Sequence, residues 1–268
     1  MSEPFARYCT VKHQYKVSGA QVTITINGVT FGYRRDNRVL SELTTTFPRG
    51  ASVLLGPNGA GKSTLLGLIA DTLRPRSGTI TVEGIGGAGD RGNRKRYRQG
   101  VAWLPQRSAA FPGLTAREHV AYCGWLKGLT RRDAWDRART ALAAVDLASR
   151  SDVRASTLSG GQVRRLGVAG ALVSGAQWIL LDEPTAGLDP AQRARFAQVV
   201  QHLPPDVSVV VSTHQTEDVA TTYDHVTVLV DGKVPFAGPV HTFTEPFATL
   251  SPAAAVTASY ARFTSEDD

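Results

Sequence analysis

The stretch GPNGAGKST, residues 56–64, constrains the fold more than any other part of this 268-residue sequence. It follows the apolar run SVLL and precedes the apolar run LLGLIA, so a glycine-rich loop joins a buried strand to a helix. Backbone N–H groups of such a loop can wrap around phosphates, Lys62 can reach the β- and γ-phosphates, and Ser63 can ligate Mg²⁺. We therefore predict that the whole loop binds a nucleotide, through Gly56, Pro57, Asn58, Gly59, Ala60, Gly61, Lys62, Ser63 and Thr64.

Short apolar runs bounded by Gly, Pro or Asp recur along the chain. They are VTITING, GASVLLG, GTITVEG, GVAWLP, QWILLD, DVSVVVST and HVTVLVDG. The segments SVLL, WILL and VVV are apolar on both faces, which is typical of strands covered on both sides in a parallel sheet. The stretch DGKVPFAG has the pattern of a hairpin, and its Pro235 favours an edge strand. The sequence predicts an α/β fold: a P-loop (RecA-like) core sheet with antiparallel edge strands.

The region from Phe111 to about Ser156 has no strand pattern and indicates an inserted α-helical subdomain. A capping-box spacing precedes HVAYCGWLKGL, and the later stretch RRDAWDRARTALAAVDLA has apolar residues at helical spacing. The capping pair is Thr115 and Glu118, and the stripe is Trp135, Ala138, Leu142 and Val145. The predicted limits are 1–20 for an N-terminal extension, 21–106 and 157–238 for the nucleotide-binding core, 107–156 for the helical subdomain and 239–268 for a C-terminal tail.

Charge and composition argue against a zinc or disulfide protein, a secreted protein and a membrane-spanning chain. The net charge of +7 permits a nucleic-acid or anionic-membrane partner, but a solvated basic surface is the more common outcome. We therefore expect the basic stretch at residues 84–100 to be a solvated loop. The two cysteines, Cys9 and Cys123, have no metal-binding spacing, which indicates a reduced cytoplasmic protein. The first 19 residues contain no apolar h-region, so we expect no secretory signal there, and the longest apolar run, at residues 166–181, is shorter than the roughly 20 residues that span a membrane. Any membrane-spanning part would therefore belong to another chain.

Polar residues follow several of the predicted strands. Asp182 and Glu183 end QWILLDEP, where open α/β sheets present their ligand groups. Asp182 suits the shell of Mg²⁺ and Glu183 suits a general base, although an acidic pair after a strand is also ordinary turn chemistry. Gln106 and His214 also come directly after predicted strands. Either Gln106 contacts metal and water and His214 contacts the γ-phosphate, or both are ordinary loop residues. Tyr33 can stack on adenine or simply pack.

The ordered set of motifs resembles the ATPase subunit of an ATP-binding cassette (ABC) transporter. The set comprises GPNGAGKST, Gln106, LSGGQ at residues 158–162, ILLDEP, AGLD at residues 186–189 and STH ending in His214, and the resemblance covers roughly residues 22–238. It implies ATP and Mg²⁺ as cofactors, with Ser63, Gln106 and Asp182 at the metal. It also implies that two cassettes close head to tail, so that the LSGGQ helix of one covers the γ-phosphate on the other. Ser159, Gly160, Gly161 and Gln162 then bind ATP in trans, and Asp189 crosses the same interface.

The resemblance also implies a polytopic transmembrane subunit as a partner, which places this chain peripherally at the cytoplasmic face of the cell membrane. Contact with that subunit is expected around Phe111, Leu114 and Tyr122, and internal packing of the subdomain is the other reading. The sequences FPGLT and LKGL are similar to those found in cassettes of export systems whose membrane subunit is a separate chain. We expect no nucleic-acid partner. A soluble cassette that acts on ribosomes or DNA is the alternative, and whether the dimer is homomeric or heteromeric stays open.

Overall fold

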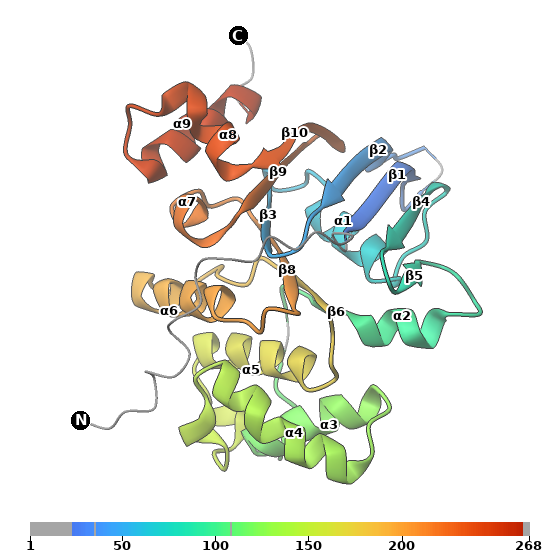
Figure 1. Cartoon of the computed structure of the whole chain (residues 1–268), viewed down its shortest axis with the longest axis vertical. Helices are drawn as coiled ribbons and strands as arrows, with labels where there is room; N and C mark the ends of the chain where they lie inside the picture. Colours follow the sequence, from blue (N-terminus) through green and yellow to red (C-terminus); the bar gives the residue numbers. More distant parts are fainter. Residues whose placement is uncertain (1–22, 35, 108, 265–268) are drawn as a thin grey trace.

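The computed structural model describes residues 23–34, 36–107 and 109–264. The predicted N-terminal extension and Cys9 lie outside the described residues. Figure 1 shows a central sheet, a second sheet beside it, a helical lobe around α3 and α4, and a group of C-terminal helices on the far side of the central sheet from that lobe. The domain limits given above stay a prediction.

The central sheet has the parallel core that its apolar strands predict. Within the described residues it has six strands in the order β10-β9-β3-β8-β7-β6. Neighbours from β9 to β6 are parallel, while β10 pairs antiparallel with β9 at the edge, as the hairpin with Pro235 predicts. The strands are β3 (Ala51–Leu55), β6 (Val101–Leu104), β7 (Trp178–Asp182), β8 (Ser208–Thr213), β9 (His225–Val230) and β10 (Lys233–Pro239).

The remaining strands form a separate antiparallel sheet, which corrects the expectation of a single sheet. The order among the described residues is β2-β1-β4-β5, with β1 at Ile24–Phe31, β2 at Leu40–Phe47, β4 at Ser77–Val82 and β5 at Gly86–Gly87. The first strand alternates between buried and exposed residues over most of its length, so one of its faces packs while the other stays in water. A half-exposed strand of this kind suits a sheet that covers the core from outside.

Helices cover both faces of the central sheet. Helix α1 (Lys62–Ile69) is buried between the two sheets, against Trp178 and Leu180 of β7. The opposite face of β7, with Ile179 and Leu181, packs with α5 (Gly160–Leu172) and α6 (Pro190–Gln201). This alternation explains why WILL is apolar throughout, and the α/β fold class is confirmed.

The helical lobe contains the two predicted helices, α3 (Ala116–Leu126) and α4 (Arg131–Ala144), followed by the short helices η1 (Ala148–Arg150) and η2 (Ala155–Thr157). Thr115 and Glu118 make the predicted capping box. In the apolar stripe of α4, Ala138 and Leu142 are buried, but Trp135 is 42% exposed. The Arg117 guanidinium lies 3.9 Å from the Trp135 ring centroid, so this tryptophan covers an arginine instead of entering the core.

The basic stretch at residues 84–100 is more ordered than a solvated loop. It contains β5 and helix α2 (Arg94–Gly100). The buried carboxylate of Asp71 accepts from the Nε atoms of Arg94 and Arg98 at 2.9 and 3.1 Å, and the buried Tyr97 hydroxyl donates to the Ile69 carbonyl at 2.8 Å. The expectation was wrong because a buried carboxylate requires charged partners, and this one takes them from α2.

The predicted tail, to which we assigned no element, forms helices α8 (Val240–Thr244), η3 (Glu245–Phe247) and α9 (Pro252–Thr264). Helices α7 (Val219–Thr222), α8 and α9 pack on Val53, Leu55, Val226 and Val228 at the end of the central sheet that holds β9. None of the helices in the described ranges is long and apolar enough to cross a membrane.

Candidate nucleotide site

The phosphate loop lies at the carboxyl end of β3 and leads directly into α1. Gly59 and Gly61 have φ values of 86° and 102°, which L side chains rarely adopt. A Cβ atom on Gly56 would lie 2.3 Å from the Leu229 carbonyl oxygen, so the loop can pass β9 only with glycine at this position. A Cβ on Gly59 would meet no atom within 4 Å, so this part of the loop is open to a ligand. The free N–H groups at the start of α1 face the same opening and favour an anion.

Lys62 lies folded back over the loop. Its Nζ donates to the carbonyl oxygens of Gly56 and Pro57 at 2.7 and 3.1 Å, and it is 3.2 Å from Glu183 Oε1. The lysine is only 6% exposed, so its charge acts in a medium where electrostatic interactions are stronger than in water. The structure thereby joins the phosphate loop to the acidic pair, which the sequence separates by about 120 residues.

The acidic pair closes the site from the end of β7, and His214 approaches it from the end of β8. Glu183 Oε1 also accepts from His214 Nδ1 at 3.1 Å, while Glu183 Oε2 is buried and has no hydrogen-bond partner among the described residues. Glu183 has a φ of 46°, a left-handed backbone conformation that is uncommon for residues other than glycine. An orphaned carboxylate oxygen at a strained residue is suited to contact a ligand.

Ser212 is the residue of this site that sequence reasoning missed. Its Oγ donates to Asp182 Oδ1 at 2.7 Å and accepts from the Glu183 N–H at 3.1 Å. One hydroxyl therefore holds both the carboxylate of Asp182 and the backbone of Glu183. A serine among the valines of SVVVST was the available clue, because a buried hydroxyl must find a partner.

Gln106 and Tyr33 lie in less enclosed positions. Gln106 is exposed in the loop after β6, where its backbone carbonyl accepts from Arg164 of α5. Tyr33 is 66% exposed, contacts the Phe31 ring edge-on and shares a hydrogen bond of 3.2 Å with Thr64 Oγ1. The tyrosine therefore stands beside α1, with most of its surface free. Ser63 is exposed at the start of α1.

The LSGGQ segment begins α5 as a helix N-terminus. Ser159 and Gln162 form a capping box: the Ser159 N–H donates to Gln162 Oε1 at 2.9 Å, and the Gln162 N–H donates to Ser159 Oγ at 3.4 Å. Ser159 and Gly160 are exposed, whereas Gly161 packs so closely on α6 that a Cβ would lie 2.4 Å from Gln192 Oε1. Asp189 caps α6 beside it by accepting from the Gln192 N–H at 2.9 Å. Two adjacent helix N-termini therefore face solvent.

An aromatic cluster marks the helical lobe. The ring of Tyr122 lies 5.0 Å from that of Phe111 and 5.7 Å from that of Trp125, yet all three side chains remain exposed. The rings therefore pack on one another while keeping exposed surface, and contact with a membrane subunit at Phe111 and Tyr122 stays a prediction. Trp125 is an addition that the sequence reasoning had not singled out, and Leu114 is partly buried nearby in the chain.

Comparison with known proteins adds independent support. The family model described as ABC transporter matches residues 40–186. Over 185 residues the chain is 35% identical to the uncharacterized ABC transporter ATP-binding protein YxlF of Bacillus subtilis, and over 200 residues 33% identical to the linearmycin resistance ATP-binding protein LnrL of the same organism. These matches cover 69% and 73% of this chain and 60% and 63% of the relatives, so the chain spans less than two thirds of their length.

The fold agrees with that of a solved ATP-binding cassette, a dimer in a post-hydrolysis state bound to ADP and Pi. Its TM-score is 0.69 at 26% identity, over 81% of this chain and 98% of the other. The family model covers more than half of the sequence and includes the phosphate loop, the LSGGQ helix and the acidic pair. This chain belongs to the ABC transporter family, as one of its ATP-binding cassettes.

Proposed function

We propose that this chain is the ATPase subunit of an exporter, in which ATP draws two cassettes together and hydrolysis separates them. A separate polytopic membrane subunit converts this cycle into substrate movement. The observation that carries the proposal is the cluster of Lys62, Glu183 and His214 at the phosphate loop, together with an exposed LSGGQ helix start elsewhere on the molecule. A complete site then requires a second cassette.

The phosphate loop and Lys62 bind the phosphates of ATP. The N–H groups of the loop and of α1 contact phosphate oxygens, and Lys62 exchanges its carbonyl partners for the β- and γ-phosphates. Tyr33 offers an exposed ring beside α1 on which adenine stacks. These assignments use the open face at Gly59 and require no rearrangement of β3.

Mg²⁺ fits the donor set at this site. Ser63 supplies a hydroxyl, Asp182 a carboxylate and Gln106 an amide oxygen, which are hard oxygen ligands of the kind that Mg²⁺ prefers. Ser212 holds the Asp182 carboxylate in place through the 2.7 Å hydrogen bond. When bound, the ion neutralises charge on the phosphates.

Glu183 is the general base of the proposed hydrolysis. Its unpartnered Oε2 can accept a proton from the attacking water, and its Oε1 is fixed by Lys62 and His214. When ATP is bound, His214 exchanges Glu183 for the γ-phosphate as the acceptor of its N–H, and this hydrogen bond stabilises the charge of the phosphate. Both residues lie at the ends of parallel strands, where the sheet holds them rigidly.

The second cassette supplies the other half of the site. The N-terminus of α5, with Ser159, Gly160, Gly161 and Gln162, covers the γ-phosphate held by the partner's phosphate loop, and Asp189 crosses the same interface. No hydrogen bond or ion pair within the described ranges joins Ser159 to the phosphate loop of its own chain. The solved relative is a dimer, which supports this arrangement. ATP then acts as a ligand that binds only the closed dimer well and so stabilises it.

The membrane partner docks on the helical lobe. The exposed ring cluster of Phe111, Tyr122 and Trp125 offers apolar area with little conformational entropy to lose. Docking there places the chain peripherally at the cytoplasmic face of the membrane. Export as the direction is supported by the relative that is named for resistance to linearmycin.

Affinity purification of the tagged chain from detergent-solubilised membranes, followed by mass spectrometry, tests this function. A polytopic membrane protein in near-equal amount is expected, and Tyr122→Ala should reduce its recovery while Trp135→Ala, a change at an exposed aromatic residue outside the cluster, should not. Co-purification of ribosomes or DNA-repair proteins, with ATPase activity intact, would instead identify a soluble cassette ATPase.

A further inference from the structure

The loop that carries His214 is held by side chains outside all the motifs described above. It joins β8, which ends at Thr213, to α7, which begins at Val219. Within the loop, the Gln215 N–H donates to Thr213 Oγ1 at 3.0 Å. Longer-range contacts reach it from α6 on one side and from the C-terminal helix α9 on the other. The motifs assign a role only to His214 itself.

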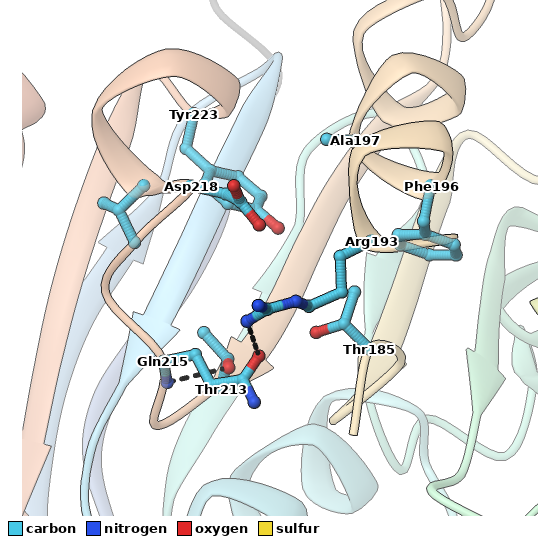
Figure 2. Close-up of a pocket in the computed structure, with 9 residues that line it drawn as sticks. Thr185, Arg193, Phe196, Ala197, Thr213, Gln215, Asp218 and Tyr223 are labelled. Carbon is cyan, nitrogen blue, oxygen red and sulfur yellow. Dashed lines mark hydrogen bonds between the residues drawn. The ribbon is translucent and has the colours of Figure 1, made fainter. Parts of the chain in front are cut away.

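Arg193 makes the contact from α6. Its Nη1 donates to Gln215 Oε1 at 3.4 Å and lies 3.9 Å from Glu217 Oε2, so one guanidinium touches two residues of the loop. Figure 2 shows this side chain crossing from α6 toward Gln215, with Thr185 beside it. Arg193 lies one turn after Asp189, the cap of the same helix. It therefore connects the proposed dimer contact to the segment next to His214.

The space around Arg193 is too small for a ligand. The cavity shown in Figure 2 has a volume of about 20 Å³ and is lined by the arginine together with Gln215, Asp218 and Tyr223. A volume of this size holds about one water molecule. The guanidinium is therefore confined near its partners in the loop, and its contacts there are structural rather than part of a second binding site.

Thr257 makes the contact from α9. Its hydroxyl lies 2.8 Å from that of Thr216, and it also donates to the Ala253 carbonyl of its own helix at 3.1 Å. Because a hydroxyl has one proton, Thr216 donates and Thr257 accepts in the bond between them. One turn further along α9, burial, followed by the charge of Glu183, raises the pKa of Tyr260 to about 12. Tyr260 on the C-terminal helix is thus close enough to Glu183 for the carboxylate charge to affect it.

We propose that Arg193 and Thr257 are positioning residues that hold the loop of His214 between α6 and α9, so that its imidazole stays aligned with Glu183 and the γ-phosphate. The inference rests on the proposed function, because it requires His214 to act in hydrolysis. Its physical basis is that misplacing a group of the site by about 1 Å can cost roughly 10²-fold in rate even when the substituted residue is remote. It gives the C-terminal helix, which lies beyond the matched family region, a part in catalysis.

Steady-state ATPase kinetics on Arg193→Met and Thr257→Val test the proposal against matched controls. Gln201→Ala removes another tether from α6, its 2.8 Å bond to the Thr221 carbonyl, and Thr264→Val removes a hydroxyl that bonds back to its own helix as Thr257 does. We expect kcat to fall about tenfold or more in Arg193→Met and several-fold in Thr257→Val, with KM changed less than about twofold and both controls near wild type. Arg193→Lys should recover part of kcat, and thermal unfolding checks that each variant is folded.

A double-mutant cycle with His214→Ala separates positioning from general structure. If Arg193 and Thr257 act through His214, their substitutions should lower kcat little further once the imidazole is gone. An equal loss in both backgrounds, or wild-type kcat in both single variants, would overturn the positioning role. A wild-type chain that hydrolyses no ATP would overturn the proposed function as well, so the two failures are distinguishable.

Discussion

At the scale of single residues, Glu183 concentrates the interactions of the nucleotide site. One of its carboxylate oxygens meets both Lys62 and His214, while the other is buried without a hydrogen-bond partner in the described ranges. Its backbone is held by Ser212 in a left-handed conformation. A carboxylate anchored on one side and unpaired on the other is prepared to accept a proton from a water placed next to it.

Glu183→Gln should keep ATP binding and slow hydrolysis by about 10²–10⁴, which is the usual contribution of a general base. The amide preserves the shape of the side chain and its contact with Lys62 but cannot accept the proton. Lys62→Ala is the contrasting variant, because it should weaken nucleotide binding itself. Titration with a fluorescent ATP analogue and a phosphate-release assay measure the two effects, and full turnover by Glu183→Gln would remove this residue from its role.

At the scale of elements, helix α3 links the aromatic cluster to the subdomain through His119. The imidazole is buried, its Nδ1 accepts from the Phe111 N–H at 3.2 Å, and its ring lies 5.0 Å from the Phe111 ring. Burial lowers the pKa of His119, so the folded protein keeps this residue neutral and able to accept. The helix therefore fixes the backbone of Phe111 only while His119 is unprotonated.

The stability of the protein should fall in acid partly through His119. The folded pKa is below the ordinary value of 6.5, so the unfolded chain binds the proton more readily, and the free energy of unfolding decreases as pH drops below 6.5 toward the folded pKa. His119→Asn retains an acceptor but does not titrate, so its melting temperature should change less than that of the wild type between about pH 7.5 and about pH 5.5.

His225→Asn is the control for this measurement. Burial lowers the pKa of His225 as well, but this residue lies on β9, far from Phe111 in the sequence. The His225→Asn substitution should therefore leave unchanged the part of the pH dependence of the melting temperature that is due to His119. A melting temperature of His119→Asn that falls with pH as steeply as the wild type's would show that this histidine does not contribute.

At the scale of the whole molecule, the proposed ATP site is divided between two segments of each chain, the phosphate loop and the start of α5. The phosphate loop follows β3 in the core, while the start of α5 is exposed beside the start of α6. One chain therefore presents a phosphate-binding loop and a second helix N-terminus that can serve another copy. Head-to-tail pairing of two such chains gives a closed dimer with two sites.

Glu183→Gln should dimerise when ATP is added, because bound ATP is no longer consumed, and size-exclusion chromatography with light scattering measures this. Adding Ser159→Asp should abolish the dimer: aspartate still caps α5, but its charge repels the γ-phosphate. Thr130→Asp places the same charge at the cap of α4 and should leave dimerisation unchanged. A monomer in all ATP-bound variants would point to a heterodimeric partner.

Much of this structure is encoded locally and can therefore be predicted from the sequence. The phosphate loop, both capping boxes and the edge hairpin depend on residues close together in the chain. Local sequence patterns did not predict three features: the separate antiparallel sheet, the helix α2 in place of a solvated loop, and the exposure of Trp135. Each depends on a partner far away in the sequence or on a competing contact.

The sequence by itself determined the phosphate loop, the helix caps and the parallel strands, because glycine conformations, capping hydrogen bonds and two-sided apolar runs are properties of short segments. Only the tertiary structure decided that Lys62, Glu183 and His214 meet and that Ser212 holds the Asp182 carboxylate and the Glu183 backbone. The contacts of Arg193 and Thr257 with the loop of His214 likewise appear only in the tertiary structure. Such contacts join positions far apart in the chain, and their geometry follows from how the strands and helices pack together.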